Sequence, residues 1–225
     1  MTMVANHPDI VGRYDIEGRT DFYLVKRTEL DRSAFALARI IERFGIAAGR
    51  YILTVALSQE IVQFAPFEEA CTMLGFIGTN ADASPMDAGR VESICRQFDA
   101  AAVCGVDAAV LQGLDEAGHA LGPIFAGRII WARPDAYHRL AALEGATVLR
   151  CAKIGPALAL ECLEKGGLHL DGREWALSAP ERTIRMTSRM ARIHPLDDVD
   201  TGVAGTVDHS ACACGSRDPR VILRD

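Results

Sequence analysis

The strongest constraint on this fold is a regular alternation of short apolar runs with amphipathic segments between residues 22 and 150. The run at 51–57 is almost continuously apolar, which is typical of a strand buried on both faces of a parallel sheet. Strands are expected at 22–25, 51–57, 75–78, 101–106, 127–131 and 146–150. Helices are expected at 32–44, 65–74, 85–98, 108–114 and 134–143, with Asp31 and Asp107 as N-caps. This alternation predicts an α/β fold with a parallel sheet flanked by helices.

The pattern changes after residue 150. Short strands are expected at 156–160, 175–177 and 183–188, separated by turns rich in glycine and aspartate. These features predict a C-terminal β-rich region of hairpins appended to the sheet. Because no repeat or low-complexity linker divides the chain, we expect a single domain over residues 1–225. Its βαβ part would cover 13–150 and its β-rich part 151–225.

Composition and charge exclude several classes of function. The chain has 24 Lys and Arg residues against 30 Asp and Glu, a formal net charge of −6. Nucleic acid is therefore not an expected partner, since binding to phosphates needs a basic surface. No run approaches the ~18 apolar residues that a membrane helix needs, so no membrane association is expected. Because residues 1–9 lack the pattern of a secretory signal, we expect a cytoplasmic protein with reduced thiols.

The seven cysteines fall into two groups. Four are scattered singly in apolar surroundings and are expected to be small core residues: Cys71, Cys95, Cys104 and Cys151. The other three lie with a histidine in a pattern suited to a closed, tetrahedral zinc site: Cys162, His169, Cys212 and Cys214. A glycine-rich hairpin would bring Cys162 and His169 together, while His209 is a possible replacement ligand. From spacing alone, unrelated surface or core groups remain the alternative.

Four blocks of the C-terminal region resemble the phenylacetate–CoA ligases of the adenylate-forming superfamily. They are the Gly-Pro-Ala-Leu-Ala-Leu-Glu-Cys run at 155–162 with Gly-Leu-His at 167–169, Met-Thr-Ser at 186–188, His-Pro-Leu at 194–196 with Asp-Thr-Gly at 200–202, and Cys-Ala-Cys-Gly at 212–215. The resemblance is specific over 155–225 and weaker over 13–150. It implies an adenylate-forming ligase core and a structural zinc site formed by Cys162, His169, Cys212 and Cys214.

The chain departs from that family at each element that handles ATP. The Ser/Thr/Gly-rich phosphate loop is replaced at 14–21 by Tyr-Asp-Ile-Glu-Gly-Arg-Thr-Asp, whose carboxylates would repel phosphate. In the segment that matches the Tyr-Gly-x-Ser/Thr-Glu loop, Ala152 stands where the acid belongs. Val203 replaces the ribose-binding aspartate. The family's C-terminal domain, which carries its adenylation lysine, would begin about where this sequence ends. ATP and magnesium are therefore not expected as cofactors.

We therefore expect a degenerate ligase core that binds a small carboxylate, an aromatic acyl metabolite or a conjugate, with or without an ATP-independent reaction. The ligand is expected near Gly105, Gly155 and Pro156, where strands of an open α/β sheet end. Cys151, flanked by Arg150 and Lys153, is a candidate nucleophile, with a buried inert thiol as the alternative. The acidic run at 197–200 could hold a cation or be a solvated loop. The alternatives are an ATP-dependent acyl- or aryl-CoA ligase and a non-catalytic partner of a full-length ligase, and a homodimer is a possible assembly.

Overall fold

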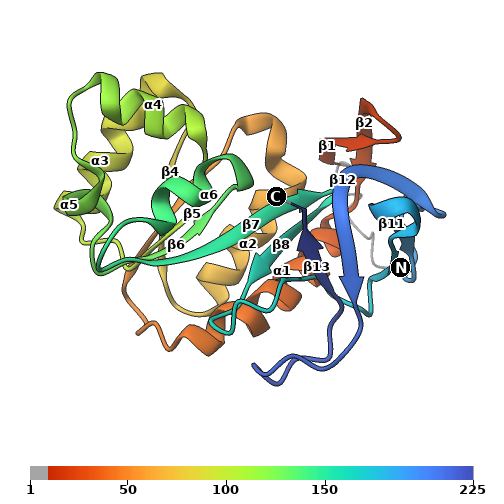
Figure 1. Cartoon of the computed structure of the whole chain (residues 1–225). Coiled ribbons are helices and arrows are strands. Elements are labelled where there is room, and N and C mark those ends of the chain that lie inside the picture. The colour runs from red at the N-terminus through yellow and green to blue at the C-terminus, as the bar shows by residue number, and fades with distance from the viewer. Residues whose placement is uncertain (1–9, 225) are drawn as a thin grey trace, which may run out of the picture.

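The computed structural model describes residues 10–224, and within them eleven strands form one sheet in the order β10-β11-β12-β13-β9-β8-β7-β6-β5-β3-β4 (Figure 1). The strands of this sheet are β3 (Tyr51–Val55), β4 (Ile77–Ala81), β5 (Ala102–Val106), β6 (Ile129–Ala132), β7 (Thr147–Ile154), β8 (Ala157–Glu161), β9 (Leu168–His169), β10 (Trp175–Ser178), β11 (Thr183–Ser188), β12 (Val199–Asp208) and β13 (Arg220–Leu223). The helices are α1 (Arg27–Ile41), α2 (Ile61–Met73), α3 (Ala88–Gln97), α4 (Ala108–Glu116), α5 (Leu121–Phe125) and α6 (Pro134–Ala141).

The half of the sheet from β4 to β7 is parallel and lies between two layers of helices, as the alternating pattern predicts. On one face, the strands pack against α3, α4, α5 and α6 through a cluster that includes Val91, Leu114 and Leu140. On the other face, α1 and α2 pack through residues such as Leu37 and Phe67. Every residue of β5 is buried, which agrees with a strand covered on both faces.

The other half of the sheet, from β8 to β10, is antiparallel. Strand β7 joins the halves, because it pairs in parallel with β6 and antiparallel with β8. The expected boundary between residues 150 and 151 therefore falls inside one continuous strand. The fold class is as predicted: α/β, with a mixed sheet and C-terminal antiparallel strands that carry a Cys/His cluster.

Residues 13–25 do not belong to a βαβ unit, which corrects the expected organisation of the N-terminal part. They form most of a separate antiparallel hairpin of β1 (Ile10–Ile16) and β2 (Arg19–Val25). The two-residue turn is Glu17 and Gly18, both with positive φ, at 52° and 73°. Two positive φ angles match the right-handed twist of a tight hairpin. The backbone N–H of Glu17 donates to the carbonyl of Asp200 at 2.5 Å, which attaches the turn to β12.

Helix α1 begins four residues before the expected N-cap Asp31, at Arg27. Glu29 accepts a hydrogen bond from the backbone N–H of Lys26 at 3.4 Å, so the capping function lies there. Asp31 instead pairs with Arg27 at 2.7 Å inside the helix. Asp107 is the N-cap of α4 as predicted, accepting from the backbone N–H of Val110 at 3.0 Å.

Candidate functional site

Four potential metal ligands converge at one end of the antiparallel half of the sheet. Cys162 follows β8, His169 lies in β9, and Cys212 and Cys214 belong to the loop between β12 and β13. Their ligand atoms all lie within 4.8 Å of one another. Leu160 pairs with His169 in the β8–β9 hairpin, so the glycine-containing turn brings Cys162 and His169 together as the sequence indicated. Gly215 closes the Cys-x-Cys turn at φ 85°, and its N–H donates to the carbonyl of Cys212 at 2.9 Å.

The spacing of these side chains fits a tetrahedral ion. Two sulfurs each about 2.3 Å from a tetrahedral zinc ion lie about 3.8 Å apart. The Sγ atoms of Cys162 and Cys212 are 3.7 Å apart, and Sγ of Cys214 lies 3.6 Å from Nε2 of His169. Three thiols and an imidazole form a soft donor set that favours zinc or a similar ion. The cluster can therefore bind a metal such as zinc.

The protonation of these groups also suits a metal ligand set. Burial, with the positive charge of Arg220 nearby, lowers the pKa of His169 to about 4, so its imidazole is neutral near pH 7. Burial and the adjacent thiols of Cys212 and Cys214 raise the pKa of Cys162 to about 12. A buried thiol of this kind needs a cation to lose its proton, which a bound metal supplies. His209 is exposed and is not one of the four clustered side chains.

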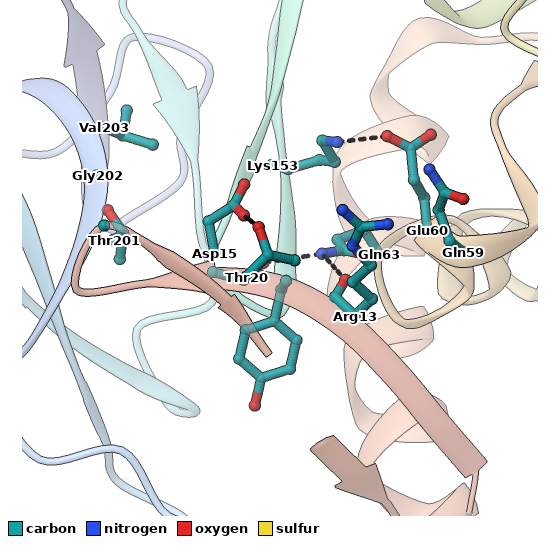
Figure 2. A pocket seen from close by; sticks show the side chains of 13 residues that line it. Arg13, Asp15, Thr20, Gln59, Glu60, Gln63, Lys153, Thr201, Gly202 and Val203 are labelled. Atoms are coloured by element: carbon teal, nitrogen blue, oxygen red, sulfur yellow. Dashed lines mark hydrogen bonds and ion pairs between the residues drawn. The ribbon is translucent and has the colours of Figure 1, made fainter. Parts of the chain in front are cut away.

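A second candidate site lies between the β1–β2 hairpin, the β7–β8 turn and the start of β12 (Figure 2). This cavity of about 470 Å³ is lined by Arg13, Tyr14, Asp15, Gly18, Thr20, Gln59, Glu60, Gln63, Lys153, Gly155, Thr201, Gly202 and Val203. Tyr14 to Thr20, Lys153 and Val203 come from the three segments that the sequence resemblance matches to ATP-handling elements. The fold thus gathers those three segments around one cavity, which we call the hairpin pocket.

Glu60 and Lys153 of the hairpin pocket belong to an ion cluster centred on Glu60, a residue that follows β3 in a short 3-10 turn. Arg133 donates to both carboxylate oxygens of Glu60, at 2.8 and 2.6 Å, and Lys153 forms a second ion pair with Glu60. Burial alone would raise the pKa of Glu60, but the hydrogen bonds from Arg133 and Lys153 lower it to about 2. Arg133 also donates to the carbonyl of Gly105 at 2.9 Å.

A smaller cavity of about 190 Å³ adjoins the hairpin pocket and shares Lys153 and Val203 with it. Its walls are mostly apolar and include Phe64, Leu158 and Leu223. The space therefore suits an apolar group next to a polar entrance.

The residues expected to bind substrate occupy different places. Gly155 lines the hairpin pocket, and its carbonyl accepts from Nε2 of Gln63 at 3.0 Å. Pro156 lines a minor cavity of about 20 Å³ between α1 and α2. Gly105 has φ 97°, and a Cβ there would lie 2.2 Å from the carbonyl oxygen of Val55. Only glycine fits this close approach, which lets the Gly105 carbonyl hold Arg133.

Cys151 lies on β7, with none of its surface exposed, and lines the smaller cavity. Its Sγ is 3.2 Å from the carbonyl oxygen of Trp131 and can donate to it. An apolar setting of this kind is typical of an inert thiol. The nucleophilic role of Cys151 stays a prediction. The acidic run at 197–200 ends in β12, and Asp198 pairs with Arg185 at 3.0 Å.

Comparison with known proteins reveals the fold rather than a close relative. No family model matches the sequence, and no curated protein matches it. A 2-hydroxyisobutyryl-CoA ligase in the postadenylation state, complexed with 2-HIB-AMP, has a similar structure with a TM-score of 0.73 at 16% identity, over 96% of this chain and 51% of the ligase. The N-terminal subdomain of NpsA from Klebsiella oxytoca, complexed with 3-hydroxyanthranilyl-AMSN, gives 0.59 at 11% identity, over 100% of this chain and 68% of that one.

An acyl-CoA synthetase-like protein from Dyadobacter fermentans gives a TM-score of 0.56 at 12% identity, over 98% of this chain and 61% of that one. The fold is that of the N-terminal domain of adenylate-forming ligases. At these identities the likeness establishes the fold alone, and the chain spans about half the length of the hydroxyisobutyryl-CoA ligase. Placement in the phenylacetate branch stays a prediction. Within the described residues, no helix is long and apolar enough to cross a membrane.

Sequence reasoning missed Glu60, Arg133 and Gln63. A positional signal could have found the first two, since each follows the carboxyl end of a parallel strand, β3 or β6. Charged residues at that edge of the sheet are candidates for a ligand site whether or not they belong to a motif.

Proposed function

We propose that this chain binds a small carboxylate or aromatic acyl compound on an adenylate-forming scaffold, without the use of ATP. The observation that carries the proposal is the junction of two cavities at Lys153 and Val203. The apolar cavity of about 190 Å³ would receive the acyl chain or ring. The hairpin pocket would receive the polar end, or the remainder of a conjugate.

The charges at the junction support an acid as ligand. Arg133 and Lys153 carry two positive charges and share one carboxylate, that of Glu60. A half-buried site with one excess positive charge favours an anion that restores the balance. Oε1 of Gln63 is also buried, and no group within residues 10–224 donates a hydrogen bond to it. A ligand hydroxyl or amino group would satisfy it, which favours a hydroxylated or amino-substituted acid.

The hairpin supports the loss of nucleotide binding. Phosphate-binding loops direct several unpaired backbone N–H groups at one anion. Here the register of β1 and β2 continues to the Ile16–Arg19 pair, and the N–H of Glu17 in the turn donates to the carbonyl of Asp200, so a two-residue turn stands in place of such a loop. Asp15 accepts a hydrogen bond from Thr20 at the mouth of the pocket and adds a negative charge (Figure 2). Val203, also on the lining, has no acceptor for ribose hydroxyls.

We also propose that the Cys162, His169, Cys212 and Cys214 cluster holds one zinc ion in a structural role. Four protein ligands close the tetrahedron, which leaves no position for substrate or reactive water. The ion would tie the β8–β9 turn to the β12–β13 loop. Metal analysis of the purified chain should give about one zinc per molecule, and folded protein without zinc would contradict this role.

Calorimetric titration tests acid binding. Benzoate, phenylacetate, isobutyrate and 2-hydroxyisobutyrate should be compared, with the last chosen to probe Gln63. At least one should bind without ATP, and Lys153→Ala should weaken it about tenfold because the excess positive charge is lost. Leu158→Phe should weaken it by filling the apolar cavity. Lys165→Ala is the matched control, since Lys165 is exposed and lies outside both cavities.

Equal binding by Lys153→Ala and Lys165→Ala would contradict the assigned site. No binding of any of the four acids at millimolar concentration would contradict the proposed ligand class. Circular dichroism of each variant separates these outcomes from loss of folding. ATP-dependent ligation, the alternative from the sequence, predicts that the acids bind tightly only with ATP present.

A further inference from the structure

A third cavity, of about 440 Å³, lies beside the Cys/His cluster and shares no lining residue with the hairpin pocket or the apolar cavity. Its lining includes Arg39, Arg43, Arg173, Arg189, Arg217 and Asp218. Five arginines and one carboxylate line it, although acidic residues outnumber basic ones in the whole chain. We call it the arginine pocket.

The one carboxylate that lines the arginine pocket, that of Asp218, already has hydrogen-bond and ion-pair partners. Asp218 accepts hydrogen bonds from the backbone N–H of Gly172 at 3.2 Å and from Oγ of Ser216 at 3.0 Å. It also pairs with Arg39 at 3.5 Å, and Arg39 pairs with Asp171 at 3.3 Å. Asp218 therefore braces the wall and neutralises one arginine, leaving the others without a balancing charge.

The remaining guanidinium groups lack carboxylate partners within residues 10–224. Arg189 donates to the carbonyl of Gly172 at 3.1 Å, and Arg43 donates to the carbonyl of Cys214 and to its Sγ, at 3.2 Å from the latter. The side chains of Arg173 and Arg217 form no hydrogen bond or ion pair in this part of the chain. These four guanidinium groups are exposed to solvent and surround one hollow, which gives it a positive potential that favours the entry of an anion.

We propose that the arginine pocket binds a ligand carrying two or more phosphate groups, such as a nucleoside diphosphate or another organic diphosphate. A single carboxylate would balance one of the four unneutralised guanidinium groups, whereas a diphosphate carries several charges and many acceptor oxygens. The planar fork of arginine matches phosphate oxygens in pairs. A volume of about 440 Å³ is in the range of small-molecule sites and accommodates more than the phosphates alone.

The site is independent of the proposed acid binding. A ligand in the arginine pocket would contact Arg43, and Arg43 donates a hydrogen bond to Sγ of Cys214 in the metal cluster. Ligand binding could therefore affect the metal cluster through this side chain. The experiment must therefore separate binding to the arginines from removal of the metal, because pyrophosphate also chelates zinc.

The test is a calorimetric titration of the full chain in magnesium-free buffer with inorganic pyrophosphate, ADP, inorganic phosphate and citrate. Pyrophosphate or ADP should bind at least tenfold more tightly than phosphate and citrate, and the affinity should fall as salt rises. Tighter binding of ADP than of pyrophosphate identifies an organic diphosphate, and the reverse identifies the free anion. Arg173→Gln/Arg217→Gln should weaken binding at least tenfold.

The matched control is Arg90→Gln/Arg96→Gln, which removes the same charge from the exposed face of α3 and should bind as the unmodified chain does. If both double variants bound pyrophosphate or ADP equally weakly, the result would contradict binding at the arginine pocket. An affinity for citrate equal to that for pyrophosphate would also contradict it. Zinc content is measured before and after titration. Heat that accompanies loss of zinc would assign the signal to chelation and contradict the proposal.

Discussion

The Cys/His cluster and the hairpin pocket differ in how their functional groups are paired. In the cluster, three thiols and an imidazole face one another at distances suited to a tetrahedral ion. In the hairpin pocket, the charged groups pair internally, with Glu60 bound by Arg133 and Lys153 and Asp15 bonded to Thr20. The first site can receive a cation, whereas in the second Glu60 balances one of the two positive charges of Arg133 and Lys153. One fold can thus combine a cluster arranged to hold a metal ion with a cavity whose charged groups pair with one another.

The largest effect is expected from Cys212→Ser. It removes one of four ligands, and metal binding in structural sites of this kind contributes ~10 kcal/mol to folding. The zinc content should fall from about one ion per chain to less than about 0.1, and the midpoint temperature of thermal unfolding should fall by more than ~10 °C. His209→Ala, an exposed residue beside the cluster, is the control and should change neither value. Unchanged zinc content and unchanged stability in Cys212→Ser would contradict a structural role for the cluster.

Glu60→Gln should have the next largest effect, about 2–3 kcal/mol in the free energy of unfolding. It leaves Arg133 without its carboxylate in a mostly buried position, while Lys153 is 37% exposed and is partly compensated by water. Urea unfolding measures the change. Glu144→Gln on the exposed surface should cost nothing measurable. Equal midpoints for the two variants would mean that the ion cluster contributes nothing.

Lowering the pH should reduce the stability of the folded chain, because Glu60 becomes protonated. The pKa of Glu60 is lowered from an ordinary value of 4.5 to about 2. A depressed folded-state pKa stabilises the native state above pH 4.5, and the contribution is lost as pH falls toward 2. Urea midpoints at pH 7, 4.5 and 3 should therefore fall more steeply for the unmodified chain than for Glu60→Gln. Parallel curves would contradict the assignment.

The smallest effect is expected from Val203→Asp. It supplies an acid at the position that the sequence resemblance matches to the ribose-binding aspartate of the ligases, but leaves the two-residue hairpin turn in place. Made in the Arg173→Gln/Arg217→Gln variant, which weakens the arginine pocket, this change should therefore leave ATP binding at the hairpin pocket undetectable by calorimetry. Recovery of binding by this one change would show that the ribose position, rather than the hairpin, limits nucleotide binding.

Most of the parallel half of the sheet was predictable because β3, β5 and β6 are buried almost throughout and have apolar sequences. Strands β12 and β13 were missed, because β12 contains two glycines and alternates buried with exposed residues too weakly to be recognised. The cluster residues were identified because thiols and imidazoles are few and chemically distinctive. Glu60 and Arg133 were not, since their pairing joins segments 73 residues apart and neither belongs to a motif.

The most direct test of the account is calorimetric titration of ATP with magnesium into the Arg173→Gln/Arg217→Gln variant, with Lys153→Ala as a companion. Removing the two arginines weakens the competing phosphate site at least tenfold, so micromolar binding that remains would belong to the hairpin pocket. We predict no binding to the arginine variant up to millimolar ATP, and no effect of Lys153→Ala on whatever the unmodified chain binds. Micromolar affinity that persists in the arginine variant and is lost in Lys153→Ala would contradict the account and restore an ATP-using ligase site.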